Sequence, residues 1–428
     1  MADAPSAVLE DTHVEDSTLA RAERDVLRGL AGRVAELAAR AVEQKKRKLW
    51  TLHNDLQKTR PMIFCDPENG WQEIITPDQM QCTHALARRW EQRLRKEVFW
   101  GERMNDDRVI EPWFNLGWIY SRSDWGMREV NIGGQDGGAR RWIAPLKELS
   151  DLSRLRFQRI EVDRPATDRM IELAGDTFGD LLPPRLRASW YWTLGLTAEL
   201  IKLRGLAQFM MDLCDNPDGL HRLMAFLRDG TMEMVSFLEK NGLYTLNNEG
   251  DYVGSGGFGW TTQLPSPDYA GRARAKDLWC LSESQETVAV SPRMFEEFVF
   301  HYQKPLLERF GLVCYGCCEP VHERWPIIKQ IRNLRRVSVS PWCDREKMAQ
   351  YLEDRYVYSL KPAPSLLAAE RFDEEAVRRD VRDALAKTRG CRLEIIMKDN
   401  NTIRHEPQRV LRWVQITREE IERQAEGL

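Results

Sequence analysis

Residues 311–340, GLVCYGCCEPVHERWPIIKQIRNLRRVSVS, decide the fold. A short β-rich run at 311–314 leads into a polar loop, and residues 321–333 then carry apolar side chains at helical spacing before a second β-rich run at 335–340. Two such runs joined by a helix are typical of parallel strands connected by a crossover helix.

The same unit recurs along the C-terminal half of the chain. The β-rich runs lie at 242–246, 277–281, 311–314, 335–340, 356–360 and 392–397, and helices are predicted at 292–310, 321–333, 344–353, 372–389 and 406–424. Two earlier candidates, Met62–Cys65 and the Trp-rich stretch 109–120, bring the number of strands to eight. This pattern favours an α/β fold of the closed (β/α)8 TIM barrel type over a doubly wound sheet. The glycine run Gly254–Gly259 does not open a helix, so it is not a dinucleotide-binding junction.

The N-terminal region differs from this pattern. Residues 16–47 space their apolar side chains three and four apart, which predicts an amphipathic helix. We therefore expect residues 1–58 to form a tail and an N-terminal helical extension, and residues 59–428 to form the barrel. The glycine-rich run 133–138 predicts an exposed loop or lid.

Composition excludes several classes of protein. The 428 residues contain 63 Lys and Arg against 66 Asp and Glu, so there is no basic excess for binding nucleic acid. No stretch has the roughly 18–20 consecutive apolar residues of a membrane helix, and the acidic N-terminus does not resemble a signal peptide. We expect a cytoplasmic protein that binds a small molecule, with its nine cysteines as reduced thiols.

Polar residues follow the predicted strands. Because active sites of parallel barrels form at the carboxyl ends of the strands, these residues should meet at one mouth. The candidate acids and bases are Glu249, Glu283, Glu286 and Asp399. The candidate substrate-binding residues are Asn248, Gln285, Lys361 and Asn400.

Three of the nine cysteines lie within the five residues 314–318. Thiolates and carboxylates suit a tetrahedral zinc site, and the candidate ligands are Cys317, Cys318, Glu319 and Cys343. The spacing also suits small buried residues at the end of a core strand, because no second paired knuckle of a zinc ribbon is present.

Two segments, RGLAQFMMDLCDNPD at 204–218 and VSPRMFEEFV at 290–299, resemble the uroporphyrinogen decarboxylase superfamily. The likeness runs from about residue 200 to the C-terminus. It implies a TIM barrel, a homodimer, and either a porphyrinogen decarboxylase or a zinc-dependent methyltransferase that works with a corrinoid (cobalamin) protein. The arginine-rich signature of the decarboxylase is absent near Arg60, which favours the methyltransferase branch.

That branch binds zinc through a His-x-Cys and a later Cys. Cys317 matches the first cysteine, but Tyr315 stands in place of the histidine and Lys398-Asp399-Asn400 in place of the later cysteine. Any metal ligand set must therefore differ from that of the superfamily.

Three hypotheses follow from these residues. The first is a methyltransferase-like enzyme that moves a methyl group between a small methylated substrate and a corrinoid or thiol acceptor, with or without a metal. The second is a metal-free decarboxylase or lyase acting on a carboxylated small molecule. The third is a barrel without catalytic activity that binds a ligand or a partner protein through residues 16–47.

Overall fold

The computed structural model describes residues 19–128, 130–133 and 140–426 of the chain. Its centre is a parallel sheet of six strands in the order β1-β14-β13-β12-β11-β10. The strands are β1 (Met62–Cys65), β10 (Trp279–Ser282), β11 (Leu312–Tyr315), β12 (Leu334–Val339), β13 (Val357–Leu360) and β14 (Arg392–Met397). All six carry β-branched, aromatic or other apolar residues on buried faces, as expected for a sheet covered on both sides.

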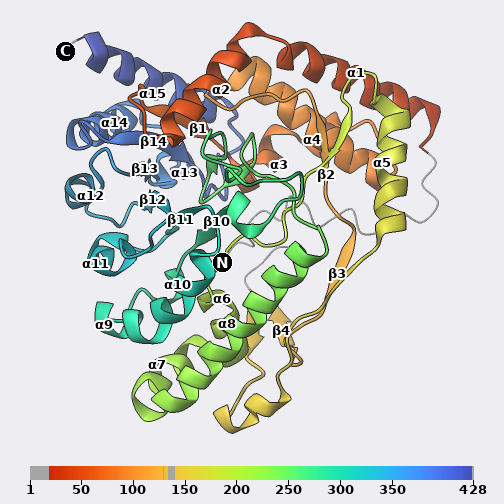
Figure 1. The fold of residues 1–428 in the computed structure, drawn as a ribbon. Helices are drawn as coiled ribbons and strands as arrows, with labels where there is room; N and C mark the ends of the chain where they lie inside the picture. The colour runs from red at the N-terminus through yellow and green to blue at the C-terminus, as the bar shows by residue number, and fades with distance from the viewer. Residues whose placement is uncertain (1–18, 129, 134–139, 427–428) are drawn as a thin grey trace.

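Helices connect successive strands, a last helix follows β14, and together they cover the outside of the sheet (Figure 1). They are α9 (Pro292–Phe295), α10 (His301–Leu307), α11 (Trp325–Ile328), α12 (Arg345–Leu352), α13 (Ser365–Ala368), α14 (Glu374–Lys387) and α15 (Gln408–Glu426). The fold is therefore mixed α/β with crossover helices, as the repeated unit predicts.

The sequence predicts a closed barrel of eight strands. Within the described residues, strand pairing does not close the sheet, and β1 and β10 are its two edges. The run 242–246 is not a strand, which corrects the prediction. Side chains cover the edges instead: Asp107 Oδ2 accepts from the Ile63 amide at 2.8 Å, and the Asn247 side chain bonds both the amide and the carbonyl of Trp279. Irregular segments thus cap the backbone groups that a neighbouring strand would bond.

The N-terminal extension consists of two helices, α1 (Arg21–Ala38) and α2 (Ala41–Asn54), where the sequence predicts one. The buried stripe of α1 includes Leu27, Leu30 and Val34, as its periodicity requires. This stripe packs against α4 (Ala85–Phe99) and α5 (Arg164–Phe178). The first residues of the predicted helix, 16–18, lie outside the described residues.

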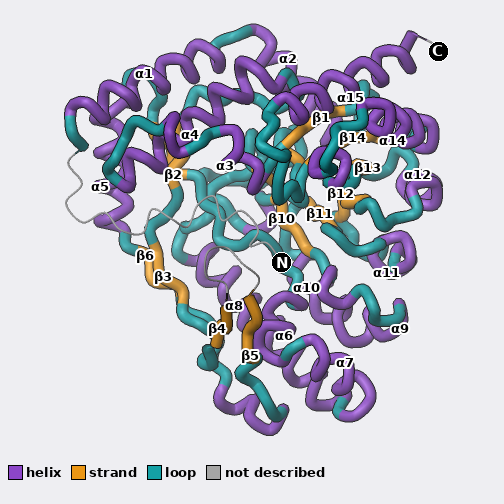
Figure 2. The backbone as a smooth tube through the Cα atoms, turned by 180° about the vertical axis from the view of Figure 1, so that it is seen from behind, coloured by secondary structure: helices purple, strands orange, loops and turns teal. Residues whose placement is uncertain are grey.

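The middle of the chain forms helices and short strands beside the main sheet. The helices are α3 (Trp71–Ile74), α6 (Thr197–Arg204), α7 (Leu206–Asp215) and α8 (Pro217–Lys240). The strands are β2 (Phe114–Leu116), β3 (Tyr120–Arg122), β4 (Val130–Gly133), β5 (Arg140–Ile143), β6 (Ile160–Val162) and β7 (Pro184–Leu186), which pair two by two. Figure 2 shows these strands apart from the central sheet. Most of the predicted glycine-rich loop falls on residues 134–139, outside the described residues.

A glycine-rich hairpin lies on the face of the central sheet opposite the crossover helices, in green between β1 and β10 in Figure 1. It consists of β8 (Tyr252–Val253) and β9 (Gly257–Phe258), and we call it the hairpin 252–258. A Cβ on Gly254 would lie 2.9 Å from the Cys314 sulfur, and one on Gly257 would lie 2.4 Å from Arg336 Cζ. The glycines therefore let backbone fill the space that large side chains fill in a packed barrel.

Among the described residues, no helix combines the length and the apolar character that crossing a membrane requires.

Candidate functional site

Cys317 and Cys318 lie at the carboxyl end of β11, and their sulfurs are 3.7 Å apart. Cys317 is buried, whereas Cys318 is exposed. The preceding Gly316 has a φ of 98°, and a Cβ there would lie 3.0 Å from Val321 Cγ1. The turn that places both thiols at the edge of the sheet therefore requires glycine.

A chain of polar contacts links these thiols to a buried lysine. Ser255 Oγ, in the hairpin 252–258, donates to Cys317 Sγ at 3.6 Å, and Lys398 Nζ donates to Ser255 Oγ at 3.5 Å. Lys398 follows β14, so segments far apart in the sequence meet at one point. The arrangement matches the predicted gathering of polar groups at the strand ends.

The hydrogen bond within the thiol pair separates the acidities of the two sulfurs. It raises the pKa of Cys317, which burial raises further, and it lowers the pKa of Cys318. A thiolate is a far better nucleophile than a thiol. Cys318 is therefore the sulfur that loses its proton first and that solvent can reach.

Lys398 is held by carboxylates of two segments. Its Nζ lies 3.3 Å from Glu68 Oε1 and 3.4 Å from Asp399 Oδ1. Burial alone lowers the pKa of Lys398, but Tyr252, Glu68 and Asp399 together hold it well above its ordinary value. Burial raises the pKa of Glu68 to about 7, against the opposing effect of Lys398. The lysine is thus a permanent cation beside a carboxyl that titrates near neutrality.

A second group of buried polar side chains lies on the central sheet. Glu394 on β14 pairs with Arg336 on β12, with Oε1 and Nε 2.9 Å apart, and His53 Nε2 lies 3.2 Å from Glu394 Oε2. Burial raises the pKa of Glu394, but Arg336, His53 and Lys361 outweigh it and hold it well below its ordinary value. Because these groups are fully buried and paired, they fix the sheet and the hairpin against each other.

Lys361, a predicted substrate-binding residue, lies at the carboxyl end of β13 and is buried. Its Nζ donates to Ser359 Oγ at 2.5 Å, and Ser359 Oγ donates to Glu394 Oε1. Burial lowers the pKa of Lys361 to about 8 despite the nearby Glu394. An amine with this pKa is able to give up its proton near neutral pH.

Three glutamates follow β10 and β11. Glu319 accepts from the amides of Ser284 at 2.8 Å and Cys317 at 2.9 Å, so it braces the thiol loop. Burial, Glu286 and Glu319 raise the pKa of Glu283 well above its ordinary value. Glu283 Oε2 accepts from the Gln285 amide at 3.0 Å, while its Oε1 is buried without a hydrogen-bond partner. Burial therefore favours the protonated form of Glu283, and one of its oxygens has no partner, two features that suit a general acid.

Other predicted site residues have structural contacts. Glu249 pairs with Arg185 at 2.6 Å, and the Asn248 side chain donates to the Leu264 carbonyl at 2.8 Å. Asn400 donates to the Pro364 carbonyl at 3.4 Å, and Glu286 accepts from Thr197 Oγ1 at 2.7 Å.

The four predicted metal ligands do not form one coordination set. Both carboxylate oxygens of Glu319 accept from backbone amides, and Cys343 Sγ donates to the Glu319 carbonyl at 3.7 Å. Among the residues that the structure describes, no three His, Cys, Asp or Glu side chains are grouped so that they could hold a metal ion. Since zinc sites in proteins use three or four protein ligands, the residues present do not fit zinc.

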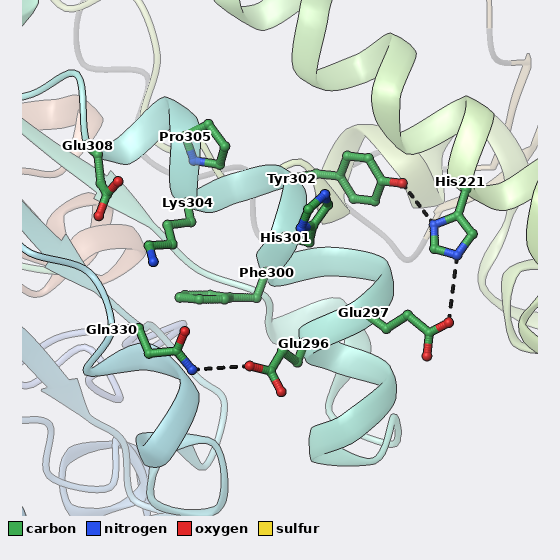
Figure 3. Close-up of a pocket in the computed structure, with 10 residues that line it drawn as sticks. All are labelled: His221, Glu296, Glu297, Phe300, His301, Tyr302, Lys304, Pro305, Glu308 and Gln330. Atoms are coloured by element: carbon green, nitrogen blue, oxygen red, sulfur yellow. Dashed lines mark hydrogen bonds and ion pairs between the residues drawn. The ribbon is translucent and has the colours of Figure 1, made fainter.

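A pocket with a volume of about 770 Å³ is lined by residues of α8, of α10 and of the segment 296–300 (Figure 3). His221 points into it, 2.8 Å from the Tyr302 hydroxyl and 3.7 Å from Glu297 Oε1. None of the predicted site residues lines it.

Sequence reasoning missed Ser255 and Glu68. Ser255 stands within the glycine run 254–259, and a run so rich in glycine signals a close approach of backbone to other groups. Glu68 follows the first strand in the same way as the predicted residues follow theirs, so the rule of strand ends should have included it.

Comparisons with known proteins do not establish a family. No family model and no curated protein matches the chain. A solved structure of a methyltransferase from Methanosarcina mazei is similar over 89% of this chain and 98% of that chain, with 10% sequence identity and a TM-score of 0.48. Values this low leave the function to be argued from the residues of the site.

Proposed function

We propose that the chain is a methyltransferase-like enzyme that moves a methyl group between a small methylated substrate and a thiol or corrinoid acceptor. The observation that carries the proposal is the thiol pair Cys317 and Cys318 at the carboxyl edge of the sheet, with the exposed sulfur 3.7 Å from the buried one. Support also comes from the sequence resemblance to the methyltransferase branch of the uroporphyrinogen decarboxylase superfamily.

Cys318 acts as the nucleophile in this proposal. Its thiolate attacks the methyl carbon, a carbon–sulfur bond forms, and the bond to the leaving group breaks with its electron pair on the leaving group. The final thiol or corrinoid acceptor would then take the same methyl carbon, and the carbon–sulfur bond would break with its electron pair returning to the Cys318 thiolate. Glu283, whose pKa burial raises well above its ordinary value, supplies the proton that the leaving group takes up. The cation Lys398 stabilises the negative charge that develops nearby.

The acceptor and the partner belong to the same proposal. Trp342, in the loop after β12, is 74% exposed, and Val288 in the loop after β10 is 48% exposed. Exposed apolar side chains at a catalytic edge suit a protein partner, which here would carry the corrinoid. A homodimer and a cytoplasmic location complete the proposal.

The test uses the full chain with reduced cobalamin and a panel of methylated amines, sulfides and methoxy compounds. Formation of methylcobalamin is followed by absorbance. The wild type should form it from at least one class of donor, and Cys318→Ala should abolish the reaction. Cys214→Ser, which changes an exposed cysteine on α7, is the matched control and should leave the rate unchanged. A Cys318→Ala rate equal to that of the wild type would contradict the proposal.

One observation favours the second candidate, a metal-free decarboxylase or lyase. Glu283 has a pKa well above its ordinary value and one oxygen without a partner, and Lys361 has a pKa of about 8, so an acid and a base are both present without the thiols. This candidate predicts that Glu283→Gln abolishes turnover of a carboxylated substrate while Cys317→Ala retains it. The methyltransferase proposal predicts loss of activity on removal of the thiols.

A further inference from the structure

Cys317 and Cys318 are neighbours in the chain and in space. Their sulfurs are 3.7 Å apart, and Cys318 is exposed. The nearby cysteines are engaged elsewhere, since Cys314 Sγ accepts from Arg336 Nη1 at 3.6 Å and Cys343 Sγ lies 3.6 Å from Ser340 Oγ. The thiol in contact with Cys318 is therefore that of Cys317.

We infer that this pair is a reversible redox switch, which peroxide closes by forming a disulfide between Cys317 and Cys318. The inference concerns the thiols of the proposed function, but it does not depend on methyl transfer. Oxidation would remove the free sulfur that any reaction at this site uses.

The chemistry balances with one peroxide per pair. The Cys318 thiolate attacks a peroxide oxygen, the O–O bond breaks, and the departing hydroxide takes up a proton to leave water and a sulfenic acid. The Cys317 sulfur then attacks the sulfenic sulfur, the S–O bond breaks, and a second water leaves. The two thiols lose two electrons in total, and hydrogen peroxide gains them.

Exposure sets the order of these steps. Peroxide reaches Cys318 first, because it is exposed, whereas Cys317 is only 6% exposed. Reactive redox cysteines are commonly accessible and placed beside a second cysteine that resolves the sulfenic acid. The Cys317 sulfur, 3.7 Å from that of Cys318, lies close enough to resolve it.

The geometry of neighbouring residues makes this disulfide easy to reduce. Consecutive Cα atoms are about 3.8 Å apart, whereas disulfides usually join Cα atoms about 4.4–6.8 Å apart. The ring between Cys317 and Cys318 is therefore strained, and strained or exposed disulfides are the labile, regulatory ones. A switch at this pair would reopen with a mild thiol reductant.

The test counts free thiols in native full-length protein after hydrogen peroxide treatment, denaturation and labelling with N-ethylmaleimide. The tryptic peptide Phe310–Arg324 contains Cys314, Cys317 and Cys318, so Cys314 is an internal reference. We expect one label on this peptide and the loss of two hydrogens after peroxide, and three labels again after dithiothreitol.

Two variants sharpen the result. Cys317→Ala should leave Cys318 with no resolving thiol and convert it to sulfinic acid, while the matched control Cys343→Ala should still form the disulfide. Sulfinic acid at Cys318 in the wild type, a disulfide to Cys343, or three labels after peroxide would each overturn the inference. Because this readout is independent of methyl transfer, failure of the switch and failure of the proposed function are distinguishable.

Discussion

The substitution Gly257→Ala tests whether the hairpin 252–258 fills the space against the central sheet. Gly257 does not have a positive φ, so alanine adds no backbone strain there. Its Cβ would lie 2.4 Å from Arg336 Cζ and 2.6 Å from Nε. Arg336 has little freedom to move, because it pairs with Glu394 at 2.9 Å and donates to Asn54 Oδ1 at 2.6 Å.

The loss of stability caused by Gly257→Ala follows from these contacts. Overpacking of a filled interior costs about 1–3 kcal/mol, and displacing Arg336 from Glu394 adds part of the roughly 3–5 kcal/mol cost of breaking a buried ion pair. We expect Gly257→Ala to lower the free energy of unfolding by at least about 2 kcal/mol.

Thermal and urea unfolding of purified full-length protein measure this change. The matched control is Gly29→Ala in helix α1, where an added Cβ meets nothing within 4 Å. That change should be neutral or stabilise by about 0.5–1 kcal/mol, because alanine is the better helix former. If Gly257→Ala unfolds at the same temperature as the wild type, the hairpin does not pack against Arg336 and the account of the site is wrong.

Two further predictions concern carboxyl groups. Burial raises the pKa of Asp277, but Arg274 and Ser266 outweigh it and lower the pKa from 3.8 to about 2. The Asp277 carboxylate therefore contributes about 2 kcal/mol to the free energy of unfolding above pH 3.8. This contribution is lost as the pH falls through 2. Asp277→Asn should therefore destabilise at neutral pH and have little effect near pH 2, and an equal loss at both pH values, measured by urea unfolding, would contradict this. Because burial raises the pKa of Glu283 well above its ordinary value and so disfavours its charged form, Glu283→Gln should leave the melting temperature nearly unchanged. Glu319→Gln, in contrast, removes an acceptor from a backbone amide and should cost about 1–3 kcal/mol. Equal melting temperatures for these two variants would show that Glu319 does not brace the thiol loop.

The sequence predicts most of the sheet and only part of the site. Five of the six predicted strands of the repeated unit are found within two residues of their predicted bounds, because a buried parallel strand and a crossover helix leave strong local patterns. Closure of the ring depends on long-range geometry, and Asp107 and Asn247 cap the sheet edges through contacts that no local pattern reveals. The rule of strand ends placed three residues correctly, because each follows a strand of the sheet: Lys361, Cys317 and Cys318. Glu249 follows the run 242–246, which is not a strand.

The most direct test of the central claim is the rate at which iodoacetamide alkylates each cysteine of the native protein, followed by peptide mass spectrometry over a range of pH. The account predicts that at neutral pH Cys318 reacts faster than the exposed reference Cys214, and that Cys317→Ala moves the Cys318 profile to higher pH, because it removes the S–H that donates to the thiolate. A Cys318 profile that is unchanged by Cys317→Ala, or a Cys318 that reacts more slowly than Cys214, would contradict it.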